Sequence, residues 1–112
     1  MAEAIARFSG ASNEVRGCAF IGPTGVLAAS GSAPDWESAG QALLEAADRA
    51  AKGRATHAHV ATEEGEVFAA RSGELAMVAV TSRYTLASLV FADMRAALRD
   101  ASAGAVPAAE AA

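Results

Sequence analysis

The stretch S-A-P-D-W-E-S-A-G-Q-A-L-L-E-A-A-D-R-A-A-K-G, residues 32–53, predicts one amphipathic helix with start and stop signals at both ends. Ser32 and Asp35 fit a capping-box pattern, in which side-chain oxygens accept hydrogen bonds from the amides of the first turn. Pro34 is tolerated there because a first-turn residue has no intrahelical use for an N–H group. Gly53 supplies the left-handed residue that helices often need just past their end. The helix is therefore predicted to fill nearly the whole stretch.

The apolar side of this helix is unusually wide. At about 100° per residue, it spans an arc of about 160°, whereas packing on one layer needs little more than ~100°. We therefore predict that the helix packs on its own sheet and also on a second surface. Leu44, at the flank of the arc, is the strongest candidate for a contact outside the monomer, and Leu44→Glu is expected to place a charge in that contact. For Trp36 core packing is favoured, with an interface anchor as the alternative.

The bulk composition indicates a single domain with few special chemistries. The chain has 112 residues, a net charge of −4 and one cysteine. The scattered Lys and Arg residues form no basic face, which argues against nucleic-acid binding. No apolar run approaches the ~18 residues of a membrane span, and the first residues do not fit a signal peptide. One cysteine excludes an internal disulfide. We expect a cytoplasmic protein without membrane insertion.

Five further runs predict strands. Two are joined by the turn G-P-T-G, and three follow the long helix at the spacing of a meander. The last run is apolar at nearly every position, so it is expected to be central with layers on both faces. The third run is small and polar and contains His57 and His59, which predicts an edge strand. In chain order the runs are Arg16–Ile21, Val26–Ser30, Thr56–Thr62, Glu66–Arg71 and Leu75–Thr81.

The two ends of the chain complete the predicted organisation. Residues 1–13 hold a short helix or strand that would dock through Ile5 and Phe8. A second long helix is expected from Thr85 to about Asp100, and residues 101–112 are predicted to be a disordered Ala-rich tail. Residues 14–100 would then form an α/β three-layer sandwich, with a five-stranded, mainly antiparallel sheet and one long helix on each face.

Two segments of this domain resemble the Roadblock/dynein light chain family. The first is V-R-G-C-A-F-I-G-P-T-G-V-L-A-A-S-G, followed by the helix that contains the Leu-Leu pair. The second is S-R-Y-T-L-A-S-L-V-F-A-D-M-R-A-A-L-R, which is similar to the last helix of the family. The resemblance covers about residues 14–100 and rests on pattern rather than on catalytic residues.

The resemblance implies a profilin-like fold and a homodimer joined through the strand after the long helix. It also implies a platform of paired long helices, here 33–52, and a non-enzymatic regulator or scaffold that works with a small Ras-like GTPase. The implied dimer strand consists of Thr56, His57, Ala58, His59, Val60, Ala61 and Thr62. The implied platform and partner contacts are Trp36, Gly40, Leu43, Leu44, Ala47 and Ala51. Independently, the edge strand lacks the Pro, Lys or Arg that would prevent it from pairing with another strand.

Candidate chemical sites are few. His57 and His59 project from one face of a strand and could chelate a metal, but no further ligands stand at matching spacing, so a structural or interface role is favoured. If the two histidines faced each other across a dimer axis, their protonation would weaken the dimer. Cys18 is expected to be buried and inert. Glu63, Glu64 and Glu66 are expected to form a solvated acidic tip.

The sequence therefore predicts a regulator or scaffold, not an enzyme, and no cofactor. The glycine-containing turns lack the Lys-Ser/Thr of a P-loop and the three glycines of a dinucleotide site. The leading interpretation is a homodimer that docks a small GTPase through its long helices. The alternatives are a small-molecule sensor that uses the profilin-like sheet as a ligand pocket, and a structural scaffold without a GTPase.

Overall fold

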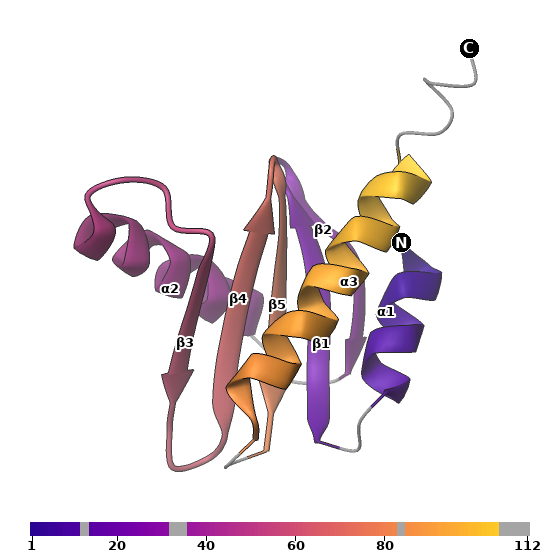
Figure 1. The fold of residues 1–112 in the computed structure, drawn as a ribbon, viewed down its shortest axis with the longest axis horizontal. Helices are drawn as coiled ribbons and strands as arrows, with labels where there is room; N and C mark the ends of the chain where they lie inside the picture. Colours follow the sequence, from indigo (N-terminus) through magenta and orange to yellow (C-terminus); the bar gives the residue numbers. More distant parts are fainter. Residues whose placement is uncertain (12–13, 32–35, 83–84, 106–112) are drawn as a thin grey trace.

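The computed structural model describes residues 1–11, 14–31, 36–82 and 85–105 of the chain. Helices and strands follow one another as the sequence predicts (Figure 1). Their bounds are α1 Ala2–Gly10, β1 Val15–Gly22, β2 Gly25–Gly31, α2 Trp36–Ala51, β3 His57–Ala61, β4 Glu66–Ser72, β5 Leu75–Thr81 and α3 Ala87–Ala105. The predicted start signals at Ser32, Pro34 and Asp35 lie outside the described residues.

The strands form one five-stranded sheet in the order β2-β1-β5-β4-β3. Every pairing is antiparallel. The apolar β5 lies at the centre, between β1 and β4, and β3 lies at an edge, so both positions predicted from the sequence are confirmed. The mainly antiparallel three-layer sandwich is confirmed as well.

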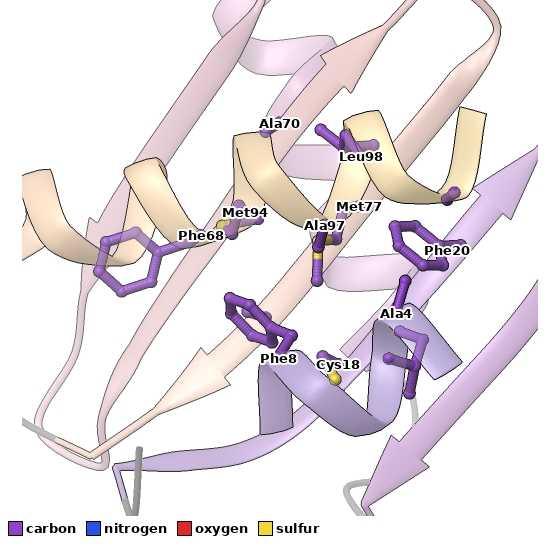
Figure 2. Close-up of a cluster of buried hydrophobic side chains, with 13 residues drawn as sticks. Ala4, Phe8, Cys18, Phe20, Phe68, Ala70, Met77, Met94, Ala97 and Leu98 are labelled. Atoms are coloured by element: carbon purple, nitrogen blue, oxygen red, sulfur yellow. The ribbon is translucent and has the colours of Figure 1, made fainter. Parts of the chain in front are cut away.

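The two faces of the sheet are covered unequally. Helices α1 and α3 lie side by side on one face, and α2 lies on the other (Figure 1). The larger core cluster lies under α1 and α3 and includes Phe8, Cys18, Phe20, Phe68, Met77 and Met94 (Figure 2). A smaller cluster lies under α2 and consists of Ala19, Ile21, Leu44, Ala69 and Val78. The prediction of one long helix on each face is correct, and α1 adds a third, shorter helix beside α3.

The first segment is a helix rather than a strand. Ile5 and Phe8 are buried in the larger core cluster, as expected, and they lie on one face of α1 because they are three residues apart. A helix of this length is marginal by itself. Packing against α3 and the sheet, together with the 3.4 Å ion pair between Arg7 and Asp100 on α3, holds it in place.

The last helix is longer than predicted. Helix α3 continues through 101–105, for which the sequence predicts a disordered tail. The prediction failed because it treated the Ala-rich composition of this segment as low complexity. Ala101 is fully buried in the core, so the helix has a tertiary reason to continue for another turn. Residues 106–112 lie outside the described part of the chain.

Two backbone positions explain how α2 ends and how β3 returns into β4. Lys52, with φ 56°, takes the left-handed conformation that the sequence analysis assigned to Gly53. Gly65, with φ 155°, lies in the β3–β4 turn, where a Cβ atom would be 2.3 Å from the carbonyl oxygen of Thr81. Only glycine fits at that turn.

Among the described helices, none combines the length and the hydropathy that a membrane span requires.

Candidate functional site: an open sheet edge beneath a projecting helix

The outer side of β3 has backbone groups that no other strand of the described residues pairs. Flanking the strand, Thr56 O accepts from Arg71 N at 2.8 Å, and Thr62 N donates to Gly65 O at 2.7 Å. Because hydrogen-bonded residues alternate along an antiparallel ladder, residues 56, 58, 60 and 62 direct their N–H and C=O groups toward β4. The groups of His57, His59 and Ala61 therefore point outward from the sheet.

The side chains of β3 secure the strand from the face that carries α3. The His59 ring stacks on Phe68 with 4.2 Å between the ring centroids and 8° between the planes. The His57 ring meets Phe91 of α3 edge-on at 5.0 Å. The aromatic partners of both histidines therefore lie within the same subunit. On the opposite face, Val60 is 41% exposed.

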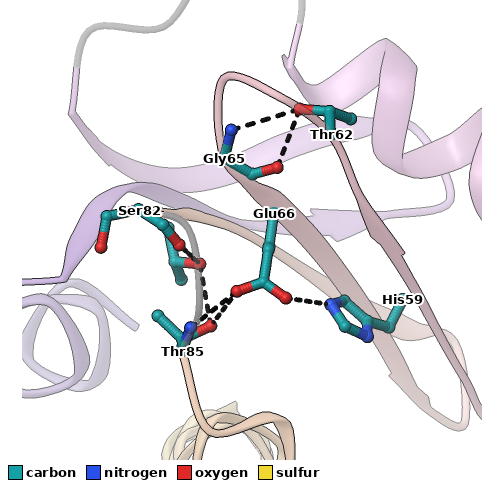
Figure 3. Close-up of polar contacts among 7 residues, drawn as sticks. His59, Thr62, Gly65, Glu66, Ser82 and Thr85 are labelled. Carbon is teal, nitrogen blue, oxygen red and sulfur yellow. Dashed lines mark hydrogen bonds and ion pairs between the residues drawn. The ribbon is translucent and has the colours of Figure 1, made fainter.

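A buried carboxylate connects β3 to the start of α3 (Figure 3). Glu66 is 6% exposed. One of its oxygens lies 2.8 Å from Nε2 of His59, and the other accepts hydrogen bonds from Thr85, from Oγ1 at 2.6 Å and from the backbone N–H at 2.8 Å. These bonds, with the Thr85 hydroxyl as the largest contribution, lower the pKa of Glu66 against the opposing effect of burial.

Glu66 is thus a structural residue that sequence reasoning missed. It was expected to belong to a solvated acidic tip, but only Glu63 and Glu64 are exposed there. The two-residue period of β4 could have distinguished the buried Glu66 from the exposed Glu63 and Glu64. Glu66 shares a face with Phe68 and Ala70, and that face lies under α3.

Helix α2 extends past this sheet edge. It contacts β5, β4 and β3 in turn, and its C-terminal end projects beyond β3 (Figure 1). Arg71 of β4 fixes that end through two parallel hydrogen bonds to Asp48, at 2.7 and 3.0 Å. Asp48 also accepts from the backbone N–H of Ala55 at 2.7 Å, and Arg71 donates to the Ala55 carbonyl at 2.9 Å. The hydrogen bond from Arg71 is the main reason that the pKa of Asp48 falls to about 2.

The predicted partner contacts of α2 have different surroundings. Gly40 is buried against Val78 of β5, and Leu44, at 3% exposure, belongs to the core cluster under the helix. The burial of Leu44 corrects the expectation that it contacts a partner. Leu43 and Ala47 are half-buried, and Ala51 is exposed. The side chain of Trp36 lies outside the described part of the chain.

The exposed side of α2 combines small alanine side chains with a few polar and charged ones. It presents Gln41, Ala42, Glu45, Ala46, Arg49 and Ala50. Ala42, Ala46 and Ala50 recur at intervals of four residues, which places them along one line on the helix. A second helix could approach this line closely, since no large side chain stands on it.

The described residues contain no group of three or more His, Cys, Asp or Glu side chains that could hold a metal ion. Cys18 is fully buried in β1, and burial raises the pKa of its thiol to about 11, which keeps it protonated and unreactive.

The layers and the strand order define the profilin-like α/β sandwich, and the fold is that of a Roadblock/LC7 domain. A Roadblock/LC7 domain from Streptomyces avermitilis matches with a TM-score of 0.78 at 11% identity, over 89% of this chain and 92% of that one. Myxococcus xanthus MglB matches with a TM-score of 0.66 at 9% identity, over 86% of each chain. No family model and no curated protein matches the sequence.

Proposed function

We propose that this protein is a homodimeric, non-enzymatic scaffold that joins two copies through β3 and α2 and docks a small Ras-like GTPase. The observation that carries the proposal is the open edge of β3, where the backbone groups of His57, His59 and Ala61 point away from β4. An unprotected edge of this kind readily pairs with another strand. No Pro, Lys or Arg within β3 prevents such pairing.

A second copy is the partner that fits this edge best. Antiparallel pairing of β3 with the same strand of another subunit is self-complementary about a two-fold axis, which is the commonest symmetry of homodimers. An axis at His59 would pair the outward groups of His57 with those of Ala61 in the other copy. The two sheets would become continuous, and the projecting end of each α2 would cover the other subunit's strand and its exposed Val60.

We propose a GTPase as the partner because the sequence resembles the Roadblock family. In the proposed dimer the two α2 helices lie next to each other, and their exposed residues Gln41, Glu45 and Arg49 supply polar contacts to a docked protein. The chain would act in the cytoplasm by binding one nucleotide state of the GTPase more tightly than the other, which shifts the population of states without chemistry of its own.

The dimer is tested by one substitution at the strand edge. Proline in Ala61→Pro removes an outward N–H group and leaves the hydrogen bonds to β4 intact, because Ala61 does not donate toward β4. Ala61→Ser is the matched control. Sedimentation equilibrium should give a dimer for the parent and for Ala61→Ser, and a folded monomer for Ala61→Pro. A parent that is monomeric at 100 µM, or an Ala61→Pro variant that dimerises as tightly as the parent, would refute the proposed interface.

The partner is tested separately by affinity capture from native lysate, in parallel with GDP and with a non-hydrolysable GTP analogue. We expect one P-loop GTPase, enriched in one nucleotide condition and lost with Glu45→Arg on the exposed side of α2. Glu74→Arg, on the exposed β4–β5 turn, is the charge-matched control. A dimeric bait that captures no GTPase in either condition would contradict the docking role and leave the dimer standing.

A further inference from the structure

The C-terminal end of α2 overhangs the sheet. The helix runs to Ala51, and its last turns lie past β3, the edge strand of the described sheet (Figure 1). Leu44 is the last fully buried side chain of the helix. After it only Ala47 and Asp48 are half-buried, and residues 49–54 are exposed.

This overhanging end lacks the usual source of helix stability. Most helices in proteins are held by the packing of an apolar face, and helix ends without such packing fray. Ala47 alone buries too little apolar surface to hold the last turns against the sheet. Any fixed position of the end must therefore come from polar contacts.

A group of hydrogen bonds supplies these contacts. Asp48 accepts two parallel bonds from Arg71 of β4, at 2.7 and 3.0 Å, and a third from the backbone N–H of Ala55 at 2.7 Å. Arg71 also donates to the Ala55 carbonyl at 2.9 Å. The backbone N–H of Gly53 donates to the Asp48 carbonyl at 3.2 Å. We call the group of Asp48, Arg71 and Ala55 the α2 clamp.

Two features make the clamp more effective than an ordinary surface ion pair. The side chain of Arg71 is only 15% exposed and that of Asp48 33% exposed, so water competes weakly for their bonds. A bidentate pair between Arg and a carboxylate also fixes orientation, because both bonds must be aligned at once. Since β4 lies inside the sheet between β5 and β3, the clamp ties the helix end to an interior strand.

We propose that Asp48 and Arg71 are positioning residues of the contact between subunits, because the α2 clamp holds the overhanging helix end in the place that a second copy of the chain needs. This inference rests on the proposed homodimer, in which the end of each α2 lies over β3 of the other subunit. Without the clamp the end would be ordered only on association. The affinity would then fall in proportion to the fraction of protomers whose end is already in place.

That fraction sets the size of the effect. An end that is correctly placed in about one protomer in three lowers the affinity about threefold for each subunit. Because the dimer needs two placed ends, the dissociation constant should rise about tenfold when both clamps are lost. The strand edge itself is unchanged, so a weaker dimer should still form.

The test measures the dimer dissociation constant by sedimentation equilibrium at pH 7, with circular dichroism to establish that each variant is folded. Asp48→Asn should raise the dissociation constant about tenfold. Arg71→Lys keeps the charge but not the two parallel bonds, so it should fall between Asp48→Asn and the parent. Asp100→Asn is the matched control, because it removes the carboxylate of the ion pair with Arg7, between α1 and α3, and should leave the dissociation constant unchanged.

Nitrogen-15 relaxation separates positioning from a general loss of structure. In the monomeric Ala61→Pro background, Asp48→Asn should lower the amide order parameters of Ala51 and Gly53 from about 0.85 to below about 0.6, and Leu44 should stay rigid. Order parameters that stay high at Ala51 and Gly53, or that fall at Leu44 as well, would overturn the positioning role.

The dissociation constants distinguish this proposal from the dimer on which it rests. A parent that dimerises, with an Asp48→Asn variant that dimerises as tightly, would overturn the positioning role and leave the proposed dimer standing. A parent that is monomeric would refute the dimer itself, and with it the role of the α2 clamp in the contact.

Discussion

Replacement of Gly40 by alanine tests how closely α2 packs on the sheet. A Cβ atom at this position would be 2.2 Å from Cγ2, 2.7 Å from Cγ1 and 2.9 Å from Cβ of Val78. Carbon atoms in contact prefer about 3.5–4.0 Å. A rotamer change of Val78 cannot relieve the clash, because the Cβ atom of Val78 is attached to the central strand and is itself too close. The helix must therefore move away from β5.

The magnitude follows from two opposing effects. Alanine favours a helix over glycine by about 1 kcal/mol. Overpacking a closely packed core costs about 1–3 kcal/mol, or more where the backbone must shift. We therefore expect Gly40→Ala to lower the free energy of unfolding by about 1–2 kcal/mol, which corresponds to a fall of about 1 M in the urea midpoint for a domain of this size.

Gly10→Ala is the matched control, because it also lies in a helix and its added Cβ atom would meet nothing within 4 Å. It should be neutral or stabilising by up to about 1 kcal/mol. Urea unfolding followed by circular dichroism, at one fixed protein concentration, measures both variants, since a dimer makes stability depend on concentration. The double variant Gly40→Ala/Val78→Ala should recover about 1 kcal/mol relative to the sum of the single changes. The reasoning is refuted if Gly40→Ala unfolds at the parent's urea midpoint or above it.

Three further predictions concern polar and sulfur groups. Because Arg71 lowers the pKa of Asp48 to about 2, the stabilisation from this pair is present above pH 4 and is lost as pH falls toward 2. Acid titration of thermal stability should show this loss in the parent and not in Asp48→Asn. Glu66→Gln should lower Tm by roughly 5 °C in differential scanning calorimetry, since two donors lose a charged acceptor. Glu64→Gln at the exposed tip should leave Tm unchanged. Cys18, whose pKa burial raises to about 11, should react with Ellman's reagent only as fast as the protein unfolds.

The sequence was most informative where side-chain pattern and backbone pairing coincide. A short apolar run bounded by turn residues favours a strand covered on both faces, so the central place of β5 could be predicted. The polar β3, with two histidines and little bulk, could be assigned to an edge for the opposite reason. The position of α1 beside α3 could not be predicted, because short amphipathic segments do not specify which face of a sheet they cover.

The apolar arc of α2 meets the sheet through Gly40 and Leu44, which corrects the assignment of Leu44 to the outward flank. Helical angles alone do not locate the direction of the sheet, so the sequence points to Leu44 as the outward residue. The glycine four positions earlier fixes that direction, since Gly40 marks the line of closest approach to Val78 and Leu44 stands on the same line one turn further along. The outward flank of the arc is instead the line of Ala46 and Ala50.

This orientation changes which experiment can detect a partner. Leu44→Glu would place a carboxylate in the core under α2 and is expected to unfold the protomer, so loss of dimer in that variant would carry no information about the interface. Ala46→Glu adds the same charge at an exposed position of the same helix. A folded Ala46→Glu protein that no longer dimerises would assign the small-residue side of α2 to the contact between subunits. A folded dimer that no longer captures the proposed GTPase would assign the same side to the docking surface.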